Sequence, residues 1–126
     1  MAEIDPFAIV LRFGKVTLPV AELEARLDTE MDRYEADRNQ LYYYAQINID
    51  NDHEPWNAAY QAIERFGPEM QKLLLDGDVG EISLDVALDL LPDVAVMTRS
   101  IPSRIAEIVG RFGIDIDVSI YVSGDT

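Results

Sequence analysis

Four aspartates on predicted strands are the residues best placed for chemistry in this chain: Asp85, Asp89, Asp115 and Asp117. Side chains two residues apart on a strand point to the same side, so each pair shares one face of a sheet. Carboxylates on neighbouring strands can approach closely enough for acid–base chemistry or for metal-assisted hydrolysis. Enzymes of these kinds surround the pair with a cleft and helper groups, and no cleft can be inferred from the sequence. A solvated acidic face is therefore favoured over catalysis.

Other residues that usually carry catalysis or bind metals are scarce. His53 is the only histidine and there is no cysteine, which excludes His-rich metal sites, disulfides and thiolate metal sites. Asp50–Glu54 resembles the start of a calcium loop, but Pro55 and Gln61 replace the glycine and the bidentate acid that such a loop requires. We therefore expect no catalytic residue, metal or cofactor, and we interpret His53 as a solvated loop residue.

The segments that alternate apolar and polar residues carry no positive charge. Leu41–Asp50, Val79–Asp89 and Ile114–Tyr121 contain no Lys or Arg, and Arg12 is the only basic residue on a predicted strand. If these strands share a sheet, one face is core and the other carries carboxylates and tyrosines without an internal counterion. Tyrosine is enriched in contact surfaces, because it combines a rigid ring with a polar tip. We therefore predict a partner-binding surface made of Tyr42, Tyr44, Asp85, Asp89, Asp115, Asp117 and Tyr121.

The same alternation predicts the strands. Phe7–Phe13 is almost continuously apolar and is interpreted as an interior strand covered, or nearly covered, on both faces. Leu41–Asp50, Val79–Asp89 and Ile114–Tyr121 each have one apolar side, as half-buried strands do. The side chains expected to point inward include Leu41, Tyr43, Ile47, Leu84, Ile116, Val118 and Ile120.

Helical spacing of apolar residues predicts the helices. The first helix begins near Pro19 and ends between Glu30 and Arg38. The next helical region opens at Pro55 and is interrupted at Gly67-Pro68, which predicts two short helices instead of one.

A last helix runs from near Pro102 to Gly113, and Leu91–Ser100 before it can be a short strand or a loop. The predicted order is β-α-β-αα-β-α-β. Because the strands alternate, helices should cover one face of the sheet and leave the other open. We predict a single α+β domain over residues 1–126, with two layers and an open four-stranded sheet that is mainly antiparallel or mixed.

The charge balance limits the class of partner. The chain of 126 residues has 24 acidic and 10 basic residues, for a net charge of −14. Nucleic acids and anionic membrane surfaces are disfavoured, because both are bound through clusters of Lys and Arg. The acidic Met1–Asp5 lacks the basic region of a signal peptide, so we expect a cytoplasmic protein. A basic protein is the favoured partner.

The C-terminal half resembles a bacterial α+β domain family of unknown function. The resemblance lies in Trp56 and the helices through Phe66-Gly67-Pro68-Glu69-Met70, in the strand Val79–Leu88, and in a closing strand at Gly113–Tyr121. Gly14–Asn39 departs from the family pattern, since it lacks the expected turn. The family has no established catalytic residues, and its character is similar to that of small acidic immunity proteins encoded beside toxins.

Three functions follow as hypotheses. The first is a non-enzymatic acidic binding module that neutralises a basic protein such as a toxin nuclease, because carboxylates on a strand face can imitate phosphates. The second is a homo-oligomeric protein, such as a homodimer formed through a sheet edge or a helix. The third is a metal-assisted hydrolase that uses Asp85, Asp115 and Asp117.

Overall fold

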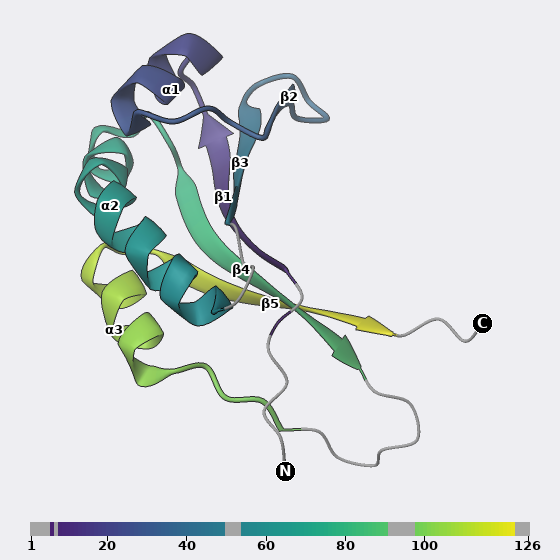
Figure 1. The fold of residues 1–126 in the computed structure, drawn as a ribbon. Coiled ribbons are helices and arrows are strands. Elements are labelled where there is room, and N and C mark those ends of the chain that lie inside the picture. Colours follow the sequence, from purple (N-terminus) through teal and green to yellow (C-terminus); the bar gives the residue numbers. More distant parts are fainter. Residues whose placement is uncertain (1–5, 7, 50–53, 91–97, 123–126) are drawn as a thin grey trace.

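The fold has two layers, an open sheet and, in the described part of the chain, three helices that cover one face of it (Figure 1). The computed structural model describes residue 6 and residues 8–49, 54–90 and 98–122. The elements are β1 (Ala8–Val16), α1 (Val20–Leu27), β2 (Arg33–Ala36), β3 (Tyr43–Ile49), α2 (Pro55–Asp76), β4 (Glu81–Leu90), α3 (Ser103–Arg111) and β5 (Asp115–Val122). The predicted α+β class and open sheet are confirmed.

The sheet is mixed and has five strands among the described residues, in the order β2-β3-β1-β4-β5. β1 pairs antiparallel with both β3 and β4, and β2 pairs antiparallel with β3. β4 and β5 are parallel, and the segment between them contains α3. The predicted number of four strands is therefore wrong, and β2 is the strand that the sequence pattern does not reveal.

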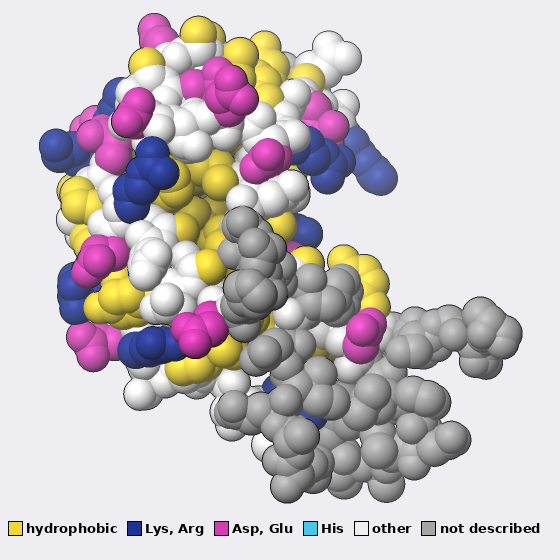
Figure 2. Space-filling model, in the orientation of Figure 1, with side chains coloured by type: hydrophobic (Ala, Val, Ile, Leu, Met, Phe, Trp, Pro, Cys, Tyr) yellow, Lys and Arg dark blue, Asp and Glu magenta, His cyan; other side chains and the backbone are white. Residues whose placement is uncertain are grey.

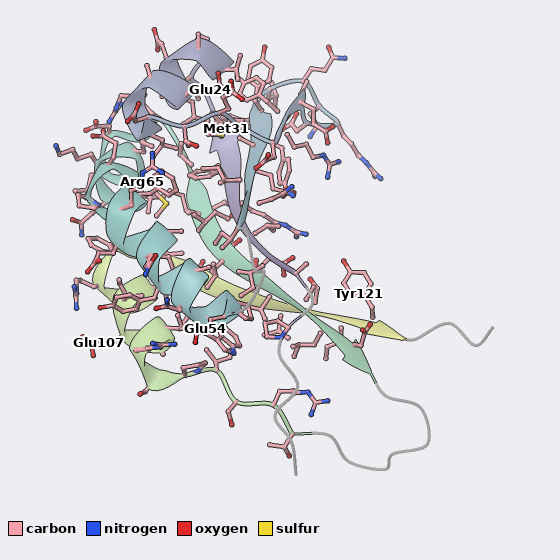
Figure 3. The ribbon with its side chains drawn as sticks, in the orientation of Figure 1. Glu24, Met31, Glu54, Arg65, Glu107 and Tyr121 are labelled. Atoms are coloured by element: carbon pink, nitrogen blue, oxygen red, sulfur yellow. The ribbon has the colours of Figure 1, made fainter. Side chains whose placement is uncertain are left out.

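β2 lies where the sequence predicts the end of the first helix. Helix α1 stops at Leu27, and Asp28 adopts a left-handed conformation with a φ of 56°. The backbone N–H of Met31 donates a hydrogen bond of 2.7 Å to the Glu24 carboxylate, which fixes the turn into β2 (Figure 3). Met31 and Tyr34 both pack against the core. Both residues thus contact the core after α1 has ended, and their helical spacing is coincidental.

Helix α2 continues without a break through Gly67 and Pro68, so the two short helices predicted there are wrong. Gly67 is buried against the end of α3, and a Cβ atom at this position would lie 2.4 Å from ring carbons of Phe112. Glycine is needed here for close packing of the two helices and not to end the first one. Helix α2 ends at Gly77, which has a φ of 79° and donates its N–H to the carbonyls of Leu73 and Leu74.

The core lies between the sheet and the helices. Its fully buried residues include Leu11, Phe13, Ile63, Leu84 and Ile105. Inward-pointing side chains are confirmed for most of β3 and β4, but Leu41 and Tyr43 are exposed because they lie before β3 or at its first residue. Tyr43 stacks on Tyr34, with the ring centroids 4.9 Å apart.

Two further expectations on the strands are wrong. β1 has one buried side only: Val10 and Arg12 lie partly exposed on the face that the helices leave open. Val118 and Ile120 are 46% and 63% exposed. The C-terminal end of β5 extends past the helices (Figure 1). Ile116 is partly buried.

Some predicted features lie outside the described residues, namely His53, the Asp50–Asp52 part of the calcium-like loop, and residues 91–97 of the segment that can be strand or loop. Thr98–Ser100 have no regular secondary structure. Within the described ranges, no helix has the length and apolar character needed to cross a membrane.

Candidate functional site

The open face of the sheet holds most of the predicted binding residues. β4 and β5 run parallel, and their register places Asp115 beside Ser83 and Asp117 beside Asp85. These residues alternate with the core residues Leu84 and Ile116, so their side chains point away from the helices. Asp115 and Asp117 are exposed. The fold therefore brings two of the predicted carboxylates together on an uncovered surface.

Asp85 differs from the other carboxylates, because it is only 3% exposed. Its Oδ2 atom forms an ion pair of 2.8 Å with the guanidinium of Arg12 on β1. Its Oδ1 atom accepts a hydrogen bond of 2.8 Å from the Ser119 hydroxyl on β5. The expectation of a face without an internal counterion is thus wrong, since Arg12 supplies one. Asp85 lies within a network across β1, β4 and β5 and not on the contact surface itself.

A depression of about 310 Å³ opens on this face beside the network. It is lined by Arg12, Gly14, Tyr44, Glu81, Ile82, Ser83, Asp115 and Asp117. Among the described residues, no ion pair involves Glu81, Asp115 or Asp117. Since Arg12 is already paired with Asp85, the depression presents three carboxylates to solvent without a cation of their own.

Tyr44 forms one wall of the depression and is held in place on both its polar tip and its ring. Its hydroxyl donates a hydrogen bond of 2.8 Å to Gln46 Oε1, and Gln46 Nε2 donates one of 2.6 Å to Asn48 Oδ1. The guanidinium carbon of Arg33 lies 5.3 Å from the ring centroid, within the range of a cation–π contact. Burial raises the pKa of the Tyr44 phenol, against the opposing effect of Arg12 and Arg33. The ring is therefore a fixed, uncharged surface at neutral pH.

The other predicted residues lie away from the depression. Asp89 pairs with Tyr121 at the far ends of β4 and β5, and neither lines the depression. Figure 3 shows Tyr121 extending from β5 on the side of the sheet opposite the helices. Tyr42 precedes β3, and its carbonyl accepts a hydrogen bond of 2.9 Å from the backbone N–H of Asp37. The predicted set is thus divided, with Tyr44, Asp115 and Asp117 together and the remaining exposed members at the margins.

Several residues of the site are absent from the predicted set: Arg12, Glu81, Ser83 and Ser119. Glu81, Ser83 and Ser119 lie on the polar side of their strands. The same alternation of polar and apolar residues predicts Asp115 and Asp117, so it could also have identified these three. Arg12 has a different signal, as the only basic residue on a predicted strand. A charged residue in an apolar run indicates a side chain that leaves the core, and the neighbouring strand must then supply its counterion.

A second depression, of about 360 Å³, lies between β3 and α2 and has a different character. No carboxylate lines it, and its one charged residue, Arg65, donates a hydrogen bond of 2.9 Å to the carbonyl of Asp28 and lies over the ring of Phe66. The helix layer carries acidic and basic side chains side by side (Figure 2). The concentration of carboxylates without cations therefore distinguishes the open sheet face as the candidate site.

Metal-binding geometry is not found in the part of the chain that the structure describes, where no three Asp, Glu, His or Cys side chains are grouped to hold an ion. Comparison with known proteins gives no match: no family model fits the sequence, and neither the curated proteins nor the solved structures contain a significant relative. The resemblance of the C-terminal half to an immunity-like family therefore stays a prediction.

Proposed function

We propose that this chain is a non-enzymatic, cytoplasmic binding module whose open sheet face binds a basic protein, as an immunity protein binds and neutralises a toxin nuclease. The observation that carries this proposal is the depression where Tyr44, Asp115 and Asp117 meet, over which no helix of the described residues lies. Helices cover the opposite face of the sheet, so the open face is available to a partner.

The charge of the depression supports a cationic side chain as its occupant. Glu81, Asp115 and Asp117 project around a hollow whose single cation is bound to Asp85. A Lys or Arg of the partner that entered the hollow would form charge-assisted hydrogen bonds with these carboxylates. The net charge of −14 adds long-range attraction that accelerates encounter with a basic surface.

Tyr44 gives the surface an aromatic anchor. Its hydrogen bond to Gln46 and its contact with Arg33 fix the ring before a partner arrives. A side chain that is already ordered loses little conformational entropy on binding, so its contact area contributes more to affinity. Rigid tyrosines of this kind are enriched among the residues that dominate binding energy.

The metal-assisted hydrolase has less support than the binding module. It requires Asp85, Asp115 and Asp117 as a common ligand set, but both oxygens of Asp85 are already engaged by Arg12 and Ser119. We therefore do not propose a catalytic role for these carboxylates.

Binding of a hexa-arginine peptide, measured by calorimetry at low and at physiological salt, tests the proposed surface. The double variant Asp115→Lys/Asp117→Lys changes the charge of the open face. The matched control, Glu22→Lys/Glu64→Lys, makes the same charge change at exposed positions of α1 and α2 that belong to no ion pair among the described residues.

The open-face variant should weaken binding at least tenfold at physiological salt, because loss of about 1.4 kcal/mol corresponds to tenfold and each direct contact between exposed charges contributes about 1 kcal/mol. The control should weaken it by less than about threefold, since charges more than roughly 8 Å from the peptide are screened. Equal losses in both variants would show that the peptide responds to net charge alone and would contradict the proposed surface.

A further inference from the structure

The two edges of the sheet differ in how they are protected from pairing with another strand. β2, at one edge, has four residues and carries the exposed side chains of Arg33 and Glu35. Short, charged edge strands resist pairing with further strands. β5, at the other edge, has eight residues; its charged residues, Asp115 and Asp117, lie in its first half, and Val118–Val122 contains no charged residue or Pro. Among the described strands, the Val118–Val122 part of β5 is therefore the edge segment that lacks this protection.

The side of β5 that faces the helix layer is also incompletely covered. Val118 and Ile120 lie at positions that would be core in a central strand, yet both are largely exposed. The C-terminal end of β5 extends beyond the helices (Figure 1). An unprotected edge combined with exposed apolar side chains indicates a surface for strand pairing.

The order of residues in β5 favours pairing with a second copy of the same strand. Around Ser119 the chain reads Asp117-Val118-Ser119-Ile120-Tyr121, in which polar and apolar positions are the same in both directions. Two such strands related by a two-fold axis at Ser119 would pair antiparallel and place Val118 opposite Ile120 of the other copy. Asp117 would lie opposite Tyr121. The apolar side of one copy thus continues into the apolar side of the other.

We propose that two copies of this chain associate through antiparallel pairing of their β5 edges, which joins the two sheets into one. The acidity of the chain does not oppose this register. The two Asp117 side chains would be four residues apart along the pair, at about 14 Å, which exceeds the screening length of roughly 8 Å. Ser119 at the axis is hydrogen-bonded to Asp85, whose charge is balanced by Arg12.

The dimer should be weak and reversible. A single pair of eight-residue strands buries less than the roughly 800 Å² per partner of a standard stable interface. We expect a dissociation constant of about 10–100 μM, because smaller interfaces belong to transient complexes. The inference does not rest on the proposed function, since it uses the edge of β5 and leaves the open face uncovered. In the dimer both open faces would lie on the same side of the joined sheet.

Sedimentation equilibrium of the full chain from about 5 to 500 μM tests the dimer, a range chosen to span that constant. The wild-type chain should change from monomer to dimer across this range. Val118→Lys/Ile120→Lys should remain monomeric, since lysine on an edge strand blocks pairing. The control Val20→Lys/Leu75→Lys adds the same charge at exposed apolar positions of helices and should dimerise as the wild type does. A monomeric wild type, or a dimer that the β5 variant preserves, would overturn the proposal.

Cross-linking tests the register even if the lysine variant fails to fold. The chain has no cysteine, so Val118→Cys and Ile120→Cys each introduce one thiol. Mixed together and oxidised, they should cross-link faster than either does alone, because opposite residues lie about 5 Å apart and diagonal ones about 7–8 Å. No preference for the mixed pair would overturn this register. A wild-type monomer that binds an added strand peptide would assign the edge to a foreign strand instead.

Discussion

Replacement of Arg12 by Leu tests the network that gives the open face its charge distribution. Arg12 is the counterion of Asp85, and the two charged groups are 2.8 Å apart. The pair is asymmetric, because the Arg12 side chain is 39% exposed while the Asp85 side chain is 4% exposed. Without Arg12, a buried carboxylate would keep one hydrogen bond, from Ser119. Without the Asp85 charge, a partly exposed guanidinium would still be solvated.

This asymmetry sets the expected free energies. Removal of one member of a fully buried ion pair costs about 3–5 kcal/mol, whereas exposed pairs contribute about 0.2–1 kcal/mol. Loss of Arg12 also admits water to Asp85, so we expect Arg12→Leu to cost about 2–3 kcal/mol of the free energy of unfolding. Asp85→Asn keeps the shape of the side chain and should cost about 1 kcal/mol. The double variant should cost less than the sum, with a coupling of at least about 1 kcal/mol.

Urea denaturation of the wild type, the two single variants and the double variant completes the cycle. Arg111→Leu is the matched control, because Arg111 forms an ion pair of 3.0 Å with Glu107 in which both side chains are exposed. That substitution should cost less than about 1 kcal/mol. A cost of Arg12→Leu no larger than that of Arg111→Leu, or simple addition of the effects of Arg12→Leu and Asp85→Asn, would contradict a buried ion pair between Arg12 and Asp85.

Two further changes test the packing and the burial of the site. Gly67→Ala should lower the free energy of unfolding by about 1–3 kcal/mol in the same urea assay, because its Cβ would overlap the Phe112 ring. The control Gly110→Ala, which has open space around it, should be neutral or stabilising. Equal effects of the two substitutions would contradict the close contact between α2 and the end of α3. Because burial raises the pKa of Tyr44, its contribution to stability is complete below about pH 10 and is lost as pH rises through the folded pKa, so Tyr44→Phe should lose less stability than the wild type as pH rises above about 10. Identical pH profiles by thermal melting would show that the phenol is not buried enough to matter.

The sequence predicts the strands of this fold better than the helix ends. Alternation of apolar and polar residues reports burial on one side directly, so β3, β4 and β5 fall within a few residues of their predicted positions. The ends of α1 and α2 depend on interactions that a periodic pattern does not contain. Asp28 ends α1 in a left-handed conformation, and Gly67 serves a contact with Phe112 that is distant in the sequence. Both helix ends were predicted wrongly because residues were interpreted from the local sequence pattern, whereas their contacts are made with segments distant in the sequence.

The sequence predicts which residues contribute to the site but not how they are paired. Polar alternation identifies Tyr44, Asp115 and Asp117, which do line one depression. The pairing of Arg12 with Asp85 requires knowledge that β1 lies beside β4, and strand order is a long-range property that alternation does not determine. The charge of a face can therefore be predicted from its strands one at a time, whereas its ion pairs cannot.

We propose that a basic protein binds at the open face. The most direct measurement is the association rate constant with a basic protein encoded beside this one, determined by stopped flow at low and physiological salt. Asp117→Lys should slow association about tenfold or more and reduce its salt dependence, while Glu22→Lys on α1 should change it by less than about twofold. If Glu22→Lys slows association and Asp117→Lys leaves it unchanged, the partner binds the helix layer and the open face is not the functional surface.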